Sequence, residues 1–179
     1  VCWGDNSRNQ ANAPFTINPI QIATGGRHAC LLDGATVDCW GWNFNGQTDV
    51  PSTLRNPRQV TAGLYHSCAL DDDGVHCWGS NAYGQTDVPE LVNPKYLSSG
   101  LGNHNCVVDD TGVVCWGDDE HSQAQALPLV RPTDVSVGYE HTCALDDSGV
   151  QCWGKNSQGQ LDVPVLDNPK QVSVGGNYS

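Results

Sequence analysis

The 179-residue chain has no methionine, no long apolar run and little positive charge. No apolar stretch approaches the roughly 18 residues that a membrane-spanning helix needs, which excludes such a helix. Lys and Arg number 8 against 20 Asp and Glu, so the formal net charge is −12. Nucleic acids and anionic membrane surfaces both require a basic face, so the composition argues against these partners. A chain that begins Val1-Cys2-Trp3 and lacks Met is expected to be a processed product or a fragment.

Glycine, proline and cysteine are abundant instead. The 20 Gly and 10 Pro favour many turns and short strands over long helices. Nine cysteines are an odd number, so at least one of them has no partner within the chain.

The cysteines follow an internal repeat of 37 or 38 residues. The tripeptide Cys-Trp-Gly begins at five places, namely Cys2, Cys39, Cys77, Cys115 and Cys152. A second cysteine precedes four of these by nine residues: Cys30, Cys68, Cys106 and Cys143. A period of this length is typical of repeat architectures, in which each repeat forms one supersecondary unit.

The spacing inside each repeat predicts a β-hairpin. In the second copy, short strands are expected over 66–70 and 75–78, joined by a four-residue loop over 71–74. Pairing Leu70 with Val75 places Cys68 opposite Cys77, and directly opposed strand residues have Cα atoms about 4.5–5.5 Å apart. That separation lies within the window of about 4.4–6.8 Å that a disulfide requires.

The same arithmetic predicts one disulfide per hairpin, and it leaves Cys2 unpaired within the chain. The predicted pairs are Cys30–Cys39, Cys68–Cys77, Cys106–Cys115 and Cys143–Cys152. The alternative is free thiols packed as small hydrophobic residues. Zinc would require Cys-x2-Cys pairs or clustered His, which a nine-residue spacing does not supply. Disulfides imply an oxidising compartment, so we expect a secreted or cell-surface protein.

Two motifs carry a family resemblance. Gly-x-x-His-x-Cys-Ala-Leu occurs at 63–70 and 138–145, and Cys-Trp-Gly-x-Asn-x-x-Gly-Gln occurs at 77–85 and 152–160. The sequence resembles the regulator of chromosome condensation repeat family, closest to its cysteine-paired, secreted bacterial branch. The resemblance implies an all-β fold, a β-propeller that typically has seven blades.

The repeat length of about 38 residues fits four-stranded propeller blades. About 4.7 blades are present, so we expect residues 1–179 to form a single β-propeller domain that is incomplete at both ends. It is either part of a seven-bladed propeller or a five-bladed ring that closes on itself.

Two residue types recur in every repeat, and each has a functional and a structural interpretation. The repeated His could form a metal ring or a proton relay, and the repeated Trp could form sugar-stacking platforms. Their fixed distance from core cysteines favours buried structural roles instead. The His positions are His28, His66, His104 and His141, and the Trp positions are Trp3, Trp40, Trp78, Trp116 and Trp153.

Variable positions are better candidates for recognition, because binding sites sit on loops held by a rigid scaffold. Trp42, Phe44 and Tyr83 lie in the loops that contain Gly-Gln, and they are the predicted contact surface. The Asp-rich loops at 71–73, 109–110 and 146–147 could bind calcium. Asp is also an ordinary turn former, which is the favoured interpretation. Asn177 begins an N-glycosylation sequon, Asn-Tyr-Ser.

The sequence contains no recognisable catalytic constellation, so we expect neither an enzyme nor a cofactor. The predicted function is a non-catalytic extracellular binding or scaffold protein that uses its propeller faces for protein–protein interaction. One alternative is a structural subunit of an extracellular fibre, sheath or adhesin. Another is a propeller lectin that binds glycans. A partner protein or self-assembly is expected, a glycan is the alternative ligand, and nucleic acid and membrane insertion are not expected.

Overall fold

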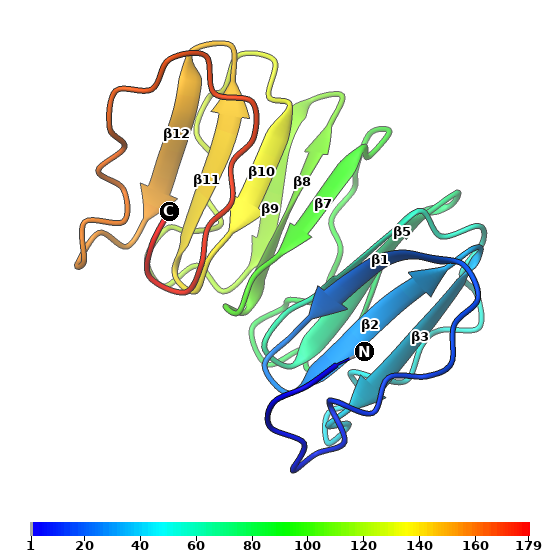
Figure 1. Ribbon diagram of the computed structural model, residues 1–179. Coiled ribbons are helices and arrows are strands. Elements are labelled where there is room, and N and C mark those ends of the chain that lie inside the picture. The colour runs from blue at the N-terminus through cyan, green and yellow to red at the C-terminus, as the bar shows by residue number, and fades with distance from the viewer. Residues whose placement is uncertain (1) are drawn as a thin grey trace.

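Four small antiparallel sheets make up the fold, as the computed structural model shows for residues 2–179 (Figure 1). Each sheet contains three strands in chain order. The strands are β1 (Pro19–Thr24), β2 (His28–Asp33) and β3 (Thr36–Gly41); β4 (Gln59–Ala62), β5 (His66–Asp71) and β6 (Gly74–Gly79); β7 (Tyr96–Ser99), β8 (His104–Asp109) and β9 (Gly112–Gly117); and β10 (Asp134–Val137), β11 (His141–Asp146) and β12 (Gly149–Gly154). Within residues 2–179, no helix is long and apolar enough to cross a membrane.

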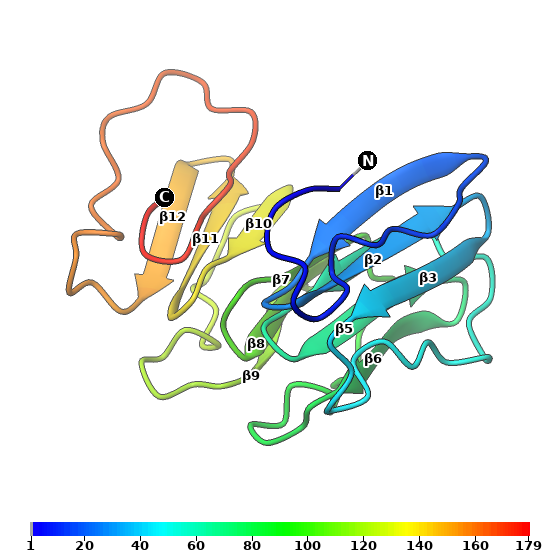
Figure 2. The same ribbon diagram turned by 60° about the horizontal axis from the view of Figure 1, so that its bottom comes forward.

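The sheets follow one another along the chain, with β1–β3 at one end of the array and β10–β12 at the other (Figures 1 and 2). Their first strands are joined by side-chain hydrogen bonds to backbone. The Gln59 side chain in β4 donates to the Leu97 carbonyl at 2.7 Å and accepts from the Leu97 amide at 2.9 Å. Gln21 in β1 likewise accepts from the Val60 amide at 2.9 Å. These bonds align each sheet as one blade beside the next.

The hairpin register is the predicted one. In the second sheet Leu70 pairs with Val75 and Cys68 with Cys77. All four predicted disulfides are present, with Cα–Cα separations of 4.0 to 4.1 Å. The loop is shorter than expected, because Asp71 and Gly74 also pair and leave a two-residue turn between them. Gly74 has φ 124°, a conformation that side chains other than glycine rarely adopt.

Each blade has three strands, where four were predicted. The residues that follow the third strand fold into a compact loop instead. Asn43 donates to Asp49 at 2.7 Å and accepts from the Thr48 amide at 2.9 Å. Pro51 follows directly and has no N–H to donate to a strand ladder. The polar loop and the proline together prevent a fourth strand.

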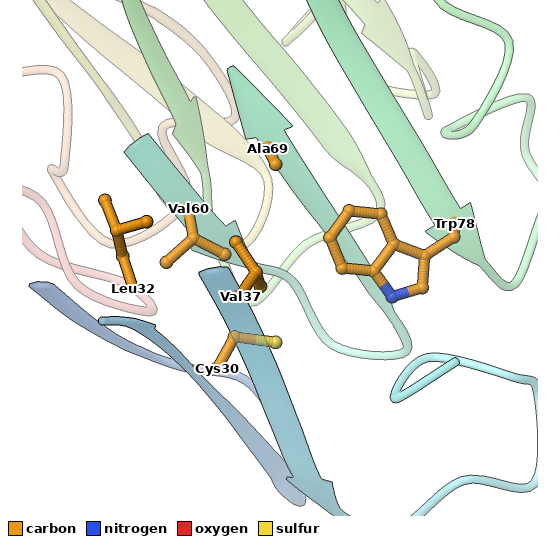
Figure 3. Close-up of a cluster of buried hydrophobic side chains, with 6 residues drawn as sticks. All are labelled: Cys30, Leu32, Val37, Val60, Ala69 and Trp78. Carbon is orange, nitrogen blue, oxygen red and sulfur yellow. The ribbon is translucent and has the colours of Figure 1, made fainter. Parts of the chain in front are cut away.

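The hydrophobic core lies between successive blades. Figure 3 shows one such cluster, formed by Cys30, Leu32 and Val37 of the first blade and Val60, Ala69 and Trp78 of the second. The same arrangement recurs at the two following blade interfaces, where Trp116 and Trp153 occupy the position of Trp78. Burial of these three indoles, at 5–8 % exposure, confirms the packing interpretation. The other two repeated Trp are not buried: Trp40 is partly buried and donates to the Gln10 carbonyl, and Trp3 is 88 % exposed.

No other described blade covers the outer face of the first blade. Ile22 in β1 pairs with Leu31 as Val60 in β4 pairs with Ala69, so the two residues hold the same place in their blades. Val60 is fully buried by the preceding blade, whereas Ile22 is 53 % exposed. Ile20 beside it is 60 % exposed. No described residue buries this apolar sheet face.

Candidate interaction surface

The repeated histidines connect one blade to the next. Nε2 of His66 lies 2.8 Å from Oδ1 of Asn105, and the Asn105 amide donates to the Gln85 carbonyl at 2.8 Å. An amide oxygen can only accept, so His66 carries its proton on Nε2 and donates it. The side chain is fully buried, which confirms a structural role.

The other three histidines repeat this arrangement with hydroxyl partners. His28, His104 and His141 contact Ser67, Thr142 and Ser179 at 2.9, 2.9 and 3.1 Å, and each hydroxyl donates onward to a glutamine carbonyl. Burial is the main cause that lowers the pKa of His28 to about 4 and of His104 to about 3. The imidazoles are therefore neutral at pH 7. Within the described residues, no group of three or more His, Cys, Asp or Glu is arranged to hold a metal ion.

The carboxylate of the first aspartate in each acidic loop accepts hydrogen bonds from backbone amides. Asp71 accepts from the amides of Arg55, Asp73 and Gly74 at 2.7, 2.8 and 3.1 Å. Asp146 accepts in the same way from Val130 and Ser148, both at 2.8 Å. These carboxylates close the hairpins and anchor the preceding loop, so the structure supports the turn interpretation over calcium binding.

The Gly-Gln loops also serve the framework. The Gln47 carbonyl accepts from Nε1 of Trp78 at 3.0 Å and from the Ser67 hydroxyl at 2.9 Å. In the third repeat Ser122 and Gln123 replace Gly-Gln and form the same loop, with Ser122 at φ 61°. These positions form hydrogen bonds within the scaffold. The side chains that are free to contact another molecule are therefore those that vary from repeat to repeat.

Two of the three predicted contact residues lie together at the end of the first blade. The rings of Trp42 and Phe44 have centroids 6.3 Å apart. Tyr65 packs edge-on against Trp42 at 5.5 Å with an interplanar angle of 85°. Phe44 is 82 % exposed. Tyr83 is 55 % exposed but lies in the next loop, and within residues 2–179 no ring contact joins it to Trp42.

Two arginines complete this surface, and the sequence analysis did not select either of them. The guanidinium carbons of Arg8 and Arg27 lie 5.7 and 5.4 Å from the centroid of the Trp42 ring. We call the set Arg8, Arg27, Trp42, Phe44 and Tyr65 the Trp42 surface. Arg8 is brought in by the segment before β1, which runs beside the first sheet (Figure 2) and receives a hydrogen bond from Trp40 at the Gln10 carbonyl.

Neither arginine of the Trp42 surface forms an ion pair within residues 2–179. Four of the other cations do pair with carboxylates: Arg55 with Asp73, Lys95 with Asp110, Arg131 with Asp147, and Lys155 with Glu140. The pKa of Asp5 is lowered, chiefly by the Ser7 amide and only slightly by the charge of Arg27. The two guanidinium charges are therefore free to meet an external anion.

A sequence signal for these missed contacts exists in the repeat itself. The Trp42 amide donates to the Arg27 carbonyl at 2.9 Å, and the Ser80 amide donates to Tyr65 in the same way one blade later. The residue after Cys-Trp-Gly therefore always lies beside the residue before the repeated His. Aligning these two variable positions would have placed Arg27 next to Trp42.

Two further predicted sites lie elsewhere. Asn177 is exposed, while Ser179 of the same sequon contacts His141 and the Gln160 carbonyl. Its glycosylation stays a prediction. Cys2 has no disulfide partner among the described residues, and it lines a hollow of about 330 Å³ that also contacts Arg27.

These features define a class of protein, a disulfide-stapled propeller repeat whose blades are joined by buried His contacts. The model of the regulator of chromosome condensation (RCC1) repeat matches residues 20–47, 58–85 and 133–160. The chain thus carries repeats of the regulator of chromosome condensation family. No curated protein sequence matches it significantly.

Solved structures share the fold. The ectodomain of the Physcomitrella patens receptor kinase CR4 is 24 % identical with a TM-score of 0.73, over 97 % of this chain and 50 % of that one. The Arabidopsis thaliana ACR4 ectodomain is 24 % identical with a TM-score of 0.64, over 76 % and 50 %. Yeast RCC1 (Prp20), solved bound to Kap60, is 18 % identical with a TM-score of 0.71, over 86 % and 47 %. The chain spans about half the length of these proteins.

Proposed function

We propose that the chain is a non-catalytic extracellular binding protein that recognises a partner protein through the Trp42 surface. The observation that carries the proposal is the composition of this surface. Two arginines without ion pairs and an 82 % exposed Phe44 surround Trp42 at positions that the repeat leaves variable. Aromatic residues and arginine are the side chains most enriched at protein interfaces.

Two observations support an extracellular location. Four disulfides persist in oxidising compartments and are rare in the cytosol. Two of the similar structures are ectodomains of plant receptor kinases. The disulfides close every hairpin, so the protein would lose this reinforcement in a reducing compartment.

The fold supports binding over catalysis. Propellers of the RCC1 type commonly mediate protein binding. The buried histidines are neutral and donate to the next blade, and the aspartates at the hairpin turns accept from backbone amides. These groups stabilise the scaffold and are not positioned as acid or base toward a substrate.

A photo-crosslinker placed at residue 44 tests the proposal. The matched control carries it at residue 82, because Ala82 holds the place of Phe44 in the next repeat and is also exposed. Both variants are incubated with the extracellular fraction of the producing organism. We expect one defined adduct from residue 44 that Trp42→Ala abolishes, and none from residue 82. Equal labelling from both positions, or none from either, would refute the Trp42 surface as the contact.

Self-assembly is a second candidate, favoured by the uncovered face of β1. Ile22 exposes 53 % of its surface at a position that is buried in the other three sheets, where Val60, Leu97 and Val135 are at most 1 % exposed. Light scattering across a concentration series tests it. The wild type should associate as the concentration rises, and Ile22→Lys should remain monomeric. Thr53→Lys, a change at an exposed position in the loop before β4, serves as the charge-matched control.

A further inference from the structure

We infer that the Trp42 surface binds a short acidic peptide segment of its partner, with an apolar side chain next to the carboxylates. The inference rests on the proposed function and specifies its ligand. It follows from three observations. The two guanidiniums have no ion-pair partner within residues 2–179, aromatic rings surround them, and the molecule as a whole is acidic.

The two guanidiniums are arranged to receive carboxylates. Each lies over the Trp42 ring, at 5.7 Å for Arg8 and 5.4 Å for Arg27, and neither has a carboxylate partner within residues 2–179. Contact with an aromatic face orients a guanidinium while it leaves the N–H edge free. That edge matches the two oxygens of one carboxylate. Two neighbouring arginines therefore match two acidic side chains that are close together in a peptide.

The rings favour a peptide over a sugar. A pyranose stacks on an open aromatic face, but the Trp42 ring already lies under two guanidiniums and against the edge of Tyr65, at 85° and 5.5 Å. The free apolar surface is Phe44, which stands 82 % exposed beside the arginines. A leucine or aromatic side chain next to the acidic residues would pack against Phe44 and exclude water from the ion pairs.

The charge of the molecule limits the ligand to a short segment. The chain has a net charge of −12, so a dense polyanion such as a sulfated glycan would be repelled by most of its surface. The equivalent edge of the fourth blade is already neutralised. There Glu140 pairs with Lys155 at 2.5 Å and contacts His121 at 3.3 Å. Among the residues that the structure describes, only those of the first blade and the segment before it bring together two arginines without ion pairs.

Nuclear magnetic resonance of the arginine side chains tests the inference directly. The chain contains five arginines, so their Nε–H signals form a small set: Arg8, Arg27, Arg55, Arg58 and Arg131. The probe is an acetylated nonapeptide of alternating aspartate and leucine, added to the disulfide-intact protein at pH 7 and low salt. We expect the Arg8 and Arg27 signals to shift in a saturable way while the other three stay in place. Raising the salt concentration should weaken the effect.

Charge-removing variants supply the affinity readout. The double variant Arg8→Gln/Arg27→Gln should bind the peptide about fivefold more weakly or worse, as expected for the loss of two exposed charge pairs. Arg55→Gln is the control, because Arg55 already pairs with Asp73 and lies at the hairpin end of the second blade. It should bind as the wild type does, and both variants should retain the wild-type melting temperature.

Three outcomes would overturn the inference. The first is the absence of a shift at Arg8 and Arg27, the second is an equal shift at all five arginines, and the third is unchanged affinity in the double variant. Binding of a heparin oligosaccharide in place of the peptide would also overturn it and would favour a glycan ligand. If the adduct at residue 44 still forms in the double variant, the inference of an acidic ligand is wrong, but the proposed function is not contradicted.

Discussion

Nε2 of His66 donates to Oδ1 of Asn105 across 2.8 Å, and the two residues belong to successive blades. The same oxygen accepts from the Ser99 hydroxyl at 2.6 Å, so one buried amide joins three strands. Because the contact recurs with hydroxyl partners in the other blades, the blade interfaces combine a hydrophobic cluster with a directional hydrogen bond. The bond fixes the position of each blade along its neighbour, which apolar packing alone specifies poorly.

Replacing His66 tests the value of this contact. His66→Leu keeps most of the side-chain volume and removes the donor, so we expect a loss of about 1–2 kcal/mol in the free energy of unfolding. Urea denaturation measures it. His121→Leu is the matched control, because His121 is partly exposed and its Nε2 lies 3.3 Å from a Glu140 carboxylate oxygen at the surface. A loss no larger than that of His121→Leu would show that the blade contact contributes little.

The buried histidines predict that the protein loses stability in mild acid. Folding lowers the pKa from 6.5 to about 4 in His28 and to about 3 in His104, mainly by burial. A lowered pKa means that the unfolded chain takes up protons first, so their contribution is complete above pH 6.5 and decreases as the pH falls toward 4. By pH 5 each should have lost about 2 kcal/mol.

Urea midpoints at pH 7.5 and pH 5 measure this loss. The pH dependence should become shallower in His104→Leu, which has one fewer buried imidazole to protonate on unfolding. Equal midpoints at the two pH values in the wild type would contradict the prediction. Below pH 4, aspartates with lowered pKa values, such as Asp109 and Asp146, add to the loss as they become protonated.

Gly63 is expected to tolerate no side chain. A Cβ atom at this position would lie 2.1 Å from Cε1 of His66, so Gly63→Ala must displace the imidazole and break its bond to Asn105. We expect a loss of 2 kcal/mol or more, roughly the cost of an overpacked core site. Thermal unfolding measures it. Gly176→Ala, where no atom lies within 4 Å, should change the stability by less than about 0.5 kcal/mol.

Alkylation followed by intact mass measurement tests the disulfides. The denatured protein should take up one alkyl group at Cys2 without reductant and nine after reduction. Uptake of nine groups before reduction would show that the hairpins hold free thiols. The double variant Cys68→Ala/Cys77→Ala should lose about 2 kcal/mol, since it opens a short loop in the unfolded chain.

The sequence alone predicted the features that depend on local spacing. Cys68 and Cys77 are nine residues apart around an Asp-rich turn, and alternation in a hairpin brings them face to face wherever the blade lies. The burial of the repeated His, and of Trp78, Trp116 and Trp153, followed from their constancy among copies. The prediction of a fourth strand was wrong, because the loop that begins at Asn43 satisfies its own amides through side chains, a preference that strand patterns do not register.

Only the tertiary structure showed which residues of successive blades contact one another. His66 and Asn105 are 39 residues apart, and their pairing depends on how two sheets stack, which the spacing within one repeat does not specify. The Trp42 surface is of the same kind. Trp42 and Phe44 were predicted from their loop, and the hairpin pairing of the first blade places Arg27 beside Trp42. Arg8 and Tyr65 come from two other segments, and only the tertiary structure brings them to the same indole ring. Hairpin geometry is local and repeats with the sequence, whereas the surface between blades depends on side chains that differ from one repeat to the next.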